Sequence, residues 1–258
     1  MTQLTISIVS HNSKADLELL MPSLIKSLNN INHEILHVDN SSSDGTWDFM
    51  QQNYPGVLSY QNSRCFGYGT NHNHNLRRAN GKYIVFMNSD MIIMPDTFEK
   101  LFVFMEENED VGLCSANVLN TDGTMQYLYK RYPTILDLSL RRFAPGFITR
   151  MFRKRLDQYE MRDDAYHSVV DVPFISGCFM FCRTDLIRQV SGFDERFFLY
   201  FEDVDLCRKV QNHARTVSFP EAVVVHRWER MAHKKARWFY IFVLSAFKYF
   251  NKWGYQFY

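Results

Sequence analysis

Apolar residues in the first half of the chain fall into short blocks whose spacing alternates between strand and helix periods. Apolar or β-branched runs of strand length lie at residues 4–9, 34–39, 58–61, 83–88 and 111–117. Helices are predicted at residues 17–28, 47–54 and 67–79, and from Asp96 onward. Ser13 can cap the first helix, and Pro22 within it predicts a kink or a later start. Strands that alternate with helices in this way predict an α/β fold with a mostly parallel sheet.

The second half of the chain has a weaker pattern and predicts fewer regular elements. From residue 130 to 170 no periodicity is visible, so we expect a loop with short helices. The later blocks predict a strand-like segment at residues 172–182, a short helix at 203–212, one or two strands at 217–225 and a long aromatic helix at 232–253. We therefore expect one domain over residues 1–230, made of halves 1–118 and 119–230, followed by a C-terminal amphipathic helix in residues 231–258.

Composition places the chain among folded globular proteins without a strong overall charge. It has 258 residues, of which 46% are hydrophobic and 16% aromatic, and its formal net charge is +1, which argues against disorder and against a general attraction to nucleic acid. The five cysteines are irregularly spaced and form no CxxC pair, so we expect reduced cysteines and no zinc site. No secretion leader is visible, and the longest apolar run, at residues 238–247, is about half of the roughly 20 residues that span a bilayer. These features predict a cytoplasmic protein that is soluble or peripherally attached to a membrane.

Polar residues follow three of the predicted strands. They are Ser10, His11, Asn12, Asp39, Asn40, Asn88, Ser89 and Asp90. Because the carboxyl ends of parallel strands share one edge of a sheet, we expect these side chains to face a common crevice. Asp39 suits the base or ribose of a nucleotide, since a carboxylate accepts hydrogen bonds from imide and hydroxyl groups. The alternative is that Asp39 closes the turn that follows it.

Asp90 and His226 each have a binding and a structural interpretation. Asp90 follows a wholly apolar strand, where a carboxylate is costly unless it meets a cation or hydrogen-bond donors. A divalent metal that bridges two phosphates is one such cation, whereas Asp90 could also simply cap the next segment. His226 ends the apolar run AVVVH and is either a metal ligand, with Asp90 as co-ligand, or a structural histidine. Asn88 could bind a metal or a phosphate through its amide oxygen.

The densest group of acidic residues lies in the stretch GFDERFFLYFEDVDL. Its acids include Asp194, Glu202, Asp203 and Asp205, and they flank a cluster of aromatic residues. Aromatic surroundings raise the pKa of a carboxylate and suit it to act as a base. Acidic residues at this position would also favour the start of a helix, and both roles can hold at once.

The motifs in chain order are VSHN, VDNSSSDG, FGYGTN, FMNSD and GFDERFFLYFEDVDLCRK, followed by a histidine after a strand. This order resembles the family 2 glycosyltransferases of the GT-A fold, which is Rossmann-like, and in particular bacterial O-antigen rhamnosyltransferases of the WbbL type. The similarity spans residues 4–230. It implies a nucleotide-sugar-binding half over residues 1–118 and an acceptor-binding half over residues 119–230.

The resemblance also implies a reaction and a set of site residues. The reaction is an inverting transfer of a sugar from a nucleoside diphosphate in one displacement, with Mg²⁺ or Mn²⁺ as cofactor. Asp203 is implied as the catalytic base and Glu202 as its neighbour in acceptor binding, while Asp205 supports the loop. The implied metal ligands are Asp90 and His226. The implied donor-binding residues are Ser10, Asn12, Asp39, Asn71, Asn88 and Ser89.

Several positions depart from the family pattern. The usual LNPD is MNSD here, so that Asn88 replaces an acid. Cys65 and Asn73 stand where relatives have glycine, which could reshape the diphosphate pocket or change the sugar. The glycine that usually follows the metal-site histidine is absent from HRWER. From the resemblance, dTDP-L-rhamnose is the first expected donor, and UDP-hexoses are the next.

Two segments combine basic with aromatic residues and predict contact with an anionic membrane. The first holds Arg141, Arg142, Arg150, Arg153, Lys154 and Arg155 among Phe143, Phe147, Ile148 and Phe152. The second holds Arg227, Arg230, Lys234, Lys235 and Arg237 before Trp238, Phe239, Phe242, Phe247, Tyr249, Phe250 and Trp253. Such segments suit the inner face of the plasma membrane and a saccharide acceptor linked to polyprenyl diphosphate. The alternative is a solvated basic face beside a helix that packs on the domain.

Other functions fit the same sheet. A nucleotidyltransferase would release diphosphate rather than a nucleoside diphosphate, and a non-catalytic nucleotide-sugar-binding module would release neither. RNA binding through the basic aromatic segments is disfavoured because no RNA-binding module is visible, so we expect no nucleic-acid partner.

Overall fold

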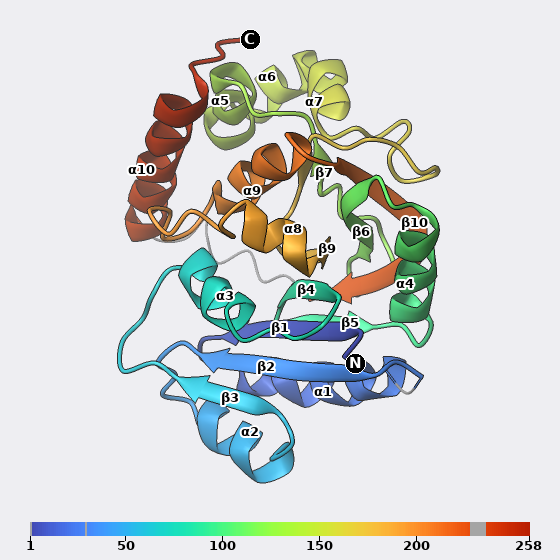
Figure 1. Ribbon diagram of the computed structural model, residues 1–258. Coiled ribbons are helices and arrows are strands. Elements are labelled where there is room, and N and C mark those ends of the chain that lie inside the picture. Colours follow the sequence, from blue (N-terminus) through green and yellow to red (C-terminus); the bar gives the residue numbers. More distant parts are fainter. Residues whose placement is uncertain (1, 29, 228–235) are drawn as a thin grey trace.

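Residues 2–28, 30–227 and 236–258 are described by the computed structural model, which shows a large sheet with helices on both faces (Figure 1). The order of the eight-stranded sheet is β3-β2-β1-β4-β9-β6-β10-β5. Its strands are β1 (Leu4–Ser10), β2 (His33–Asp39), β3 (Leu58–Gln61), β4 (Tyr83–Asn88), β5 (Met91–Ile93), β6 (Val111–Leu119), β9 (Phe179–Arg183) and β10 (Arg215–His226). A separate antiparallel pair is formed by β7 (Tyr129–Lys130) and β8 (Phe174–Ile175).

Helices connect and cover these strands. They are α1 (Lys14–Ser27), α2 (Thr46–Asn53), α3 (Tyr68–Leu76), α4 (Thr97–Glu107), α5 (Ile135–Phe143), α6 (Gly146–Met151), α7 (Arg153–Tyr159), α8 (Thr184–Gln189), α9 (Glu202–Gln211) and α10 (Ala236–Trp253). Within the described residues, no helix combines the length and apolarity that crossing a bilayer requires.

Strand pairing is mostly parallel, as the sequence predicts. β1 pairs in parallel with β2 and β4, β2 with β3, and β6 with β10. β9 lies between β4 and β6 and is antiparallel to both, and β5 is antiparallel to β10. One sheet therefore contains strands from both halves of the chain, while the proposed division of roles between the halves stays a prediction.

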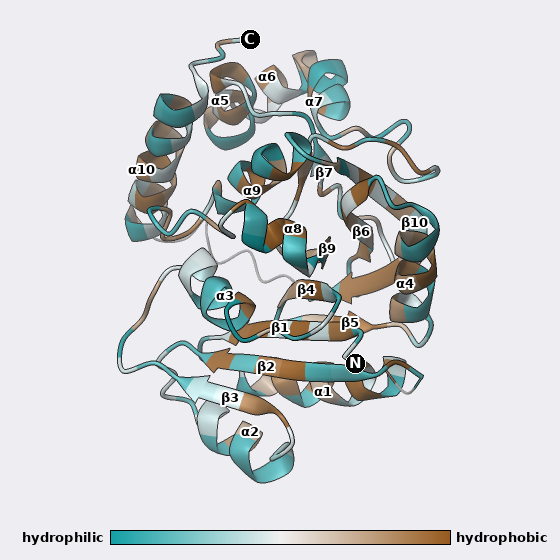
Figure 2. Ribbon diagram, in the orientation of Figure 1, coloured by the Kyte–Doolittle hydropathy of each residue, from teal (hydrophilic) through white to brown (hydrophobic). Residues whose placement is uncertain are grey.

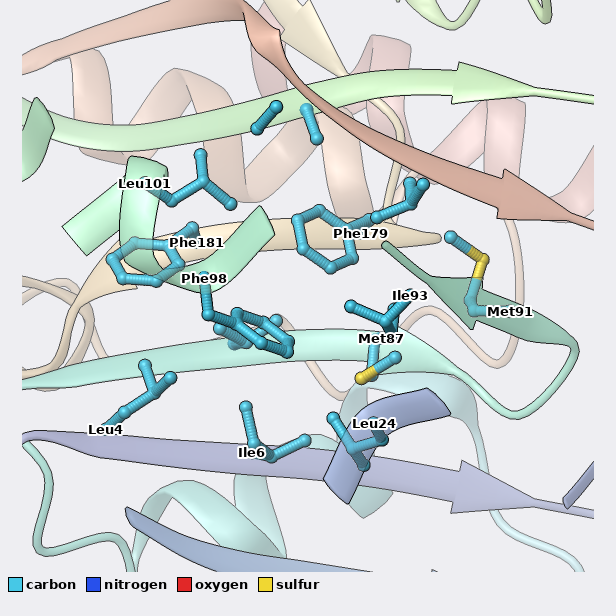
Figure 3. Close-up of a cluster of buried hydrophobic side chains, with 14 of the residues drawn as sticks. Leu4, Ile6, Leu24, Met87, Met91, Ile93, Phe98, Leu101, Phe179 and Phe181 are labelled. Atoms are coloured by element: carbon cyan, nitrogen blue, oxygen red, sulfur yellow. The ribbon is translucent and has the colours of Figure 1, made fainter. Parts of the chain in front are cut away.

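An apolar core lies on each face of the sheet. On one face, strand residues pack against α1 and α4, and Figure 3 labels Leu4, Ile6, Leu24, Met87, Met91, Ile93, Phe98, Leu101, Phe179 and Phe181. On the other face, Leu76, Ile187 and Leu206 come from α3, α8 and α9. Because the central strands are covered on both sides, they form nearly continuous apolar runs, and much of β1 is brown in Figure 2.

Of the predictions about the first helix, the Ser13 cap and the late start are wrong, while the kink at Pro22 stays a prediction. The hydroxyl of Ser13 makes no capping bond, and the N–H of Lys14 donates instead to the carboxylate of Asp44 at 3.1 Å. α1 begins at Lys14 and runs through Pro22, so it does not start late. Its buried side chains hold the helix on the sheet, and this packing outweighs the backbone hydrogen bond that proline cannot make.

Candidate active site

The carboxyl ends of β1, β2 and β4 lie side by side, as predicted. Ser10 pairs with Asp39 in the register of β1 and β2, and Val9 pairs with Asn88 across β1 and β4. A first cavity of about 280 Å³ opens at this edge. Of the predicted residues, it is lined by Ser10, Asn88, Ser89 and Asp90.

Three other predicted donor-binding residues do not line this first cavity. Asp39 is fully buried, and its carboxylate accepts hydrogen bonds from Gln61 at 3.1 Å and from the turn after β2. Asn12 accepts from the same turn, and Asn71 is buried in a hydrogen bond with Asn62. A nucleotide would have to join or replace these bonds, so the donor-binding roles stay predictions.

Asn40, like His11, lines the first cavity as expected for a residue at a strand end, and it also builds one wall of that cavity. Its amide oxygen accepts from the N–H of Phe66 at 2.8 Å and from Asn62 at 2.9 Å. Its amide nitrogen donates back to the Phe66 carbonyl at 2.9 Å. Asn40 therefore fixes the loop before α3 against the end of β2.

The pairing of β5 with β10 brings Asp90 and His226 together. His226 pairs with Met91 in that register, and the N–H of Arg227 donates to the Asp90 carbonyl at 2.9 Å. The His226 Nε2 atom lies 3.1 Å from a carboxylate oxygen of Asp90 and 3.4 Å from the Asn88 amide nitrogen. Burial acts to raise the pKa of Asp90, but the hydrogen bond and charge of His226 outweigh it and leave that pKa below its usual value.

Gln126 orients the ring of His226, and nothing in the sequence pattern pointed to it. Its amide nitrogen donates to the His226 carbonyl at 2.8 Å and to Asn120 at 2.9 Å, so its amide oxygen faces Nδ1 of His226 at 3.0 Å. Nδ1 then carries a hydrogen, which makes Nε2 the nitrogen available to a metal. A cation between Nε2 and Asp90 would take the place of the hydrogen that Nε2 donates to that carboxylate.

A metal at this position would need further ligands. Within residues 2–28, 30–227 and 236–258, no group of three or more histidine, cysteine or acidic side chains is arranged to hold one. Asp90 and His226 supply one oxygen and one nitrogen, a donor set that Mn²⁺ accepts readily. The remaining positions would fall to phosphate oxygens, water or the Asn88 amide oxygen.

Glu202 and Asp203 open helix α9, as the sequence predicts for this acidic stretch. Tyr200 and Phe201 precede them with positive φ angles of 71° and 67°, which are uncommon for aromatic residues. This turn directs both carboxyl groups into a second cavity of about 360 Å³. Asp203 accepts hydrogen bonds there from the N–H groups of Gly177 at 3.0 Å and Val204 at 2.9 Å.

The two neighbouring carboxyl groups differ in their surroundings. Burial raises the pKa of both, and the charge of Asp203 raises that of Glu202 further. One oxygen of Glu202 is buried with no hydrogen-bond partner among the described residues. Asp203 instead gains two N–H donors and the nearby charge of Lys130, which oppose the rise. We therefore assign the proton to Glu202 and the negative charge to Asp203.

The two cavities adjoin. Asn88, Tyr68 and Leu199 line both of them, and His226 lines the second cavity together with Asp203. Asp90 and Asp203 therefore line adjoining cavities, although they lie far apart in the sequence.

Gly177 makes the close approach of Asp203 to the sheet possible. Its carbonyl accepts a hydrogen bond from the hydroxyl of Tyr68 at 2.6 Å, while its N–H donates to Asp203. A Cβ atom on Gly177 would lie 3.3 Å from the Cβ of Asp203 and would crowd the carboxylate. The sequence showed this glycine only as an interruption of an apolar run.

Residues 5–190 match the model of the glycosyl transferase family 2. The chain belongs to this family. Family membership places it among the glycosyltransferases and agrees with the strand-end cavity and the paired carboxyl groups described above.

Relatives of this family-2 chain include two named rhamnosyltransferases. An N-acetylglucosaminyl-diphospho-decaprenol L-rhamnosyltransferase of Mycobacterium tuberculosis is 25% identical over 221 residues, covering 79% of this chain and 68% of the relative. Rhamnosyltransferase WbbL of Escherichia coli is 26% identical over 214 residues, which cover 80% of this chain and 75% of the relative.

Solved structures of similar fold agree with the GT-A prediction. S. aureus TarS 1-349 superposes with a TM-score of 0.60 at 17% identity, covering 87% of this chain and 60% of its own. The mannosyltransferase PcManGT from Pyrobaculum calidifontis, solved with GDP-Man and Mn²⁺, gives a TM-score of 0.60 at 16% identity. The match covers 90% of this chain and 58% of the mannosyltransferase chain. The chain thus spans about 60% of the length of these structures.

The departures from the family-2 pattern occupy different places. Cys65 lines the first cavity. Asn73 is buried and exchanges two hydrogen bonds of 2.8 Å with the backbone of Phe193, so it anchors the segment before α9. The departure in HRWER falls mainly on residues 228–230, which lie outside the described residues.

Asp205 does not support a loop, as the family resemblance implied, but anchors the C-terminal helix. It is fully buried, and its carboxylate accepts from the indole N–H of Trp253 at 2.7 Å and pairs with Lys252 at 2.6 Å. Tyr249 and Phe250 pack beside it against the segment around Phe197 and Phe201. The inner face of α10 is therefore part of the glycosyltransferase domain.

Proposed function

We propose that this chain is an inverting, metal-dependent glycosyltransferase that moves L-rhamnose from dTDP-L-rhamnose to a saccharide carried on a polyprenyl diphosphate. The rhamnosyl donor, the lipid-linked acceptor and a place in bacterial O-antigen synthesis are suggested by the names of the two relatives and by the motif resemblance. We call the first cavity the donor cavity and the second the acceptor cavity.

The observation that carries the proposal is the adjoining position of two unlike groups. Asp90 and His226 form a cation-ready pair at the donor cavity, and Asp203 lies in the acceptor cavity that shares Asn88 with it. A glycosyl transfer needs these two functions about one sugar apart.

The chemical step follows from the assignment of charge. The carboxylate of Asp203 takes the proton of an acceptor hydroxyl while that oxygen bonds to the anomeric carbon of the donor sugar. The bond from the same carbon to the diphosphate breaks, and the nucleoside diphosphate leaves with the electron pair. Because attack and departure occur on opposite sides of the carbon, the anomeric configuration inverts. Glu202, neutral and beside the base, can donate a hydrogen bond to the acceptor.

Asp90 and His226 would hold Mg²⁺ or Mn²⁺, with Gln126 fixing the histidine ring. A bound divalent ion supplies positive charge that offsets the charge developing on a leaving diphosphate. Ser10, Asn88 and Ser89 line the same cavity and would contact the donor.

The donor is tested by thermal shifts with a panel of nucleoside diphosphates and nucleotide sugars, each with and without Mn²⁺. We expect dTDP-L-rhamnose with Mn²⁺ to give the largest rise in Tm. A larger rise with a UDP-hexose would replace the rhamnosyl assignment, and release of inorganic diphosphate during turnover would indicate a nucleotidyltransferase. No shift and no hydrolysis with any donor would overturn the proposal.

We further propose that the enzyme lies on the inner face of the plasma membrane. α10 and α5 to α7 gather at one end of the molecule, far from β3 and α2 (Figure 1). The exposed apolar side chains at this end include Phe143, Phe147, Met151, Phe239, Tyr240, Val243 and Phe247. The rings of Phe143 and Phe239 meet at 5.8 Å and join the two surfaces, with exposed Arg150 and Lys154 nearby in the chain.

Part of the predicted basic surface has a structural role instead. Arg155 forms an ion pair with the buried Asp137 at 2.6 Å, and Arg153 pairs with Asp157. Arg230, Lys234 and Lys235 lie outside the described residues. The membrane contact therefore rests mainly on exposed aromatic side chains with a smaller basic contribution.

Flotation with vesicles that contain phosphatidylglycerol tests this surface. We expect the double variant Phe147→Ser and Phe247→Ser to lose most of its vesicle binding. The control is Leu58→Ser, which removes an equally exposed apolar side chain from β3 at the other end of the molecule. Equal binding by the double variant and the wild type would remove the membrane assignment and leave the transferase assignment untouched.

A further inference from the structure

The acceptor cavity contains two basic side chains that the chemical step does not use. Lys130 comes from β7 and Arg141 from the last turn of α5, and both line the cavity with Asp203. The sequence pattern assigns no role to Lys130 and places Arg141 only in a basic surface segment.

Lys130 is a buried ammonium group without an ionic partner. The residue is 8% exposed, and within the described residues its ammonium makes no hydrogen bond or ion pair. The ammonium nitrogen stands over the face of the Phe174 ring, 5.0 Å from the ring centroid. Burial, followed by the charge of Arg141, lowers the pKa of Lys130 to about 8, so it is still charged at pH 7. Such a cation is costly to bury unless a ligand meets it.

Arg141 lies nearer the mouth of the same cavity. Its side chain is 38% exposed and reaches Glu160 at 3.4 Å. Glu160 is also paired with Arg162, so one carboxylate is shared between two guanidinium groups. The guanidinium of Arg141 also stands over the ring of Tyr159 at 5.5 Å. The guanidinium of Arg141 can therefore still donate hydrogen bonds to a bound anion.

We propose that Lys130 and Arg141 form an anion-binding subsite that takes the diphosphate of the acceptor. This inference rests on the proposed function, because it names how the acceptor of that reaction is held. Lys130 would act as a point charge and Arg141 as a planar donor of paired hydrogen bonds, which together suit two linked phosphates.

The place of the subsite separates it from the donor diphosphate. Asp90, which would share a cation with the donor, lines the donor cavity, whereas Lys130 and Arg141 line only the acceptor cavity. A saccharide diphosphate in this cavity would meet the base with its attacking hydroxyl and the two cations with its phosphates.

The lining beyond the cations suits the lipid that such a diphosphate carries. Leu138, Phe174 and Phe242 complete the cavity on this side. Phe242 belongs to α10, whose outer face carries the exposed apolar side chains described above. The lining therefore combines cationic and apolar side chains, as the diphosphate and the lipid of such an acceptor require.

Calorimetric binding without turnover tests the subsite. The probes are undecyl-diphospho-N-acetylglucosamine and the uncharged undecyl N-acetylglucosaminide, measured in EDTA without donor. We expect the wild type to bind the charged probe at least about tenfold more tightly. Lys130→Met and Arg141→Gln should each reduce that affinity about tenfold and leave the uncharged probe unaffected. Lys130→Arg should keep most of the preference, because it keeps the charge.

The control is Arg150→Gln, which removes a solvent-exposed guanidinium of α6 outside the cavity. The proposal is overturned if the wild type binds both probes alike or binds neither, if Lys130→Met keeps the preference, or if it weakens both probes equally. A protein that uses a nucleotide sugar but ignores the acceptor charge would keep the proposed function and lose the subsite. A protein that prefers the charged probe but uses no donor would keep the subsite and lose the function.

Discussion

The donor and acceptor cavities adjoin, yet they satisfy their polar groups in opposite ways. Around the donor cavity, buried amides and hydroxyls are matched, as in the Asn40 bonds to Phe66 and Asn62. In the acceptor cavity, one buried oxygen of Glu202 has no hydrogen-bond partner among the described residues, and Lys130, which is only 8% exposed, forms no ion pair with them.

This difference distinguishes polar groups that stabilise the fold from polar groups that serve binding or catalysis. A matched network holds a loop in place and adds stability, whereas an unmatched buried charge lowers stability and persists only where a ligand or a reaction uses it. Substitutions on the two sides should therefore change stability in opposite directions.

The largest expected effect comes from removing the base in the acceptor cavity. Asp203→Asn keeps the shape of the side chain but cannot take a proton, so we expect transfer to fall by about 10³-fold. The rise in Tm caused by the donor should stay the same, because the donor binds in the other cavity. Asp185→Asn, on an exposed aspartate of α8, is the matched control. Full transfer activity in Asp203→Asn would remove this residue from the base role.

The next effect concerns the donor side through the ring of His226. Gln126→Ala removes the acceptor of the Nδ1 hydrogen, so we expect the Mn²⁺ concentration for half-maximal activity to rise by about 10- to 100-fold. Activity at saturating Mn²⁺ should largely recover, which a merely structural defect would not allow. Gln158→Ala, on the exposed surface of α7, should leave the Mn²⁺ dependence unchanged.

A matched polar group of the donor cavity should stabilise the fold. Asn40→Ala leaves buried partners at Phe66 and Asn62 unsatisfied, and we expect the free energy of unfolding to fall by about 2 kcal/mol. Urea denaturation measures this change, with exposed Asn53→Ala as the control. A variant as stable as the wild type would show that water replaces the amide without loss.

An unmatched group of the acceptor cavity should have the smaller and opposite effect. Glu202→Gln removes a buried carboxyl whose pKa is raised well above 4.5, and we expect about 1 kcal/mol of added stability near neutral pH. A carboxyl with a raised folded pKa stabilises the fold at low pH and loses that contribution as pH rises through the folded pKa.

Urea denaturation at pH 5 and pH 8 sharpens this comparison. The stability of the wild type should fall over this interval, whereas Glu202→Gln should keep only the part of the fall that Asp203 causes. If Glu202→Gln is less stable than the wild type at both values, the unmatched carboxyl has a structural role and the contrast between the cavities fails.

Parallel β strands and their polar ends were predictable because each depends on residues close in sequence. Ser10, Asn88 and Asp90 follow apolar runs, and a parallel sheet places such ends on one edge. Asp39 has the same sequence signal, but its carboxylate belongs to an internal network, because the turn after β2 and Gln61 supply its donors. A strand-end position alone does not tell a ligand-facing side chain from one that closes a turn.

The sequence by itself determined the α/β architecture, the family and the pair of acidic residues that opens α9, since these follow from local spacing and motif order. The proximity of Asp90 and His226 was predicted from the motifs, but only the tertiary structure decided that Gln126 orients that histidine and that Lys130 is buried beside Asp203. Those contacts join segments that come together only when β5 pairs with β10 and β7 with β8. The balance between burial and charge at each group depends on that packing, and no local pattern in the chain records it.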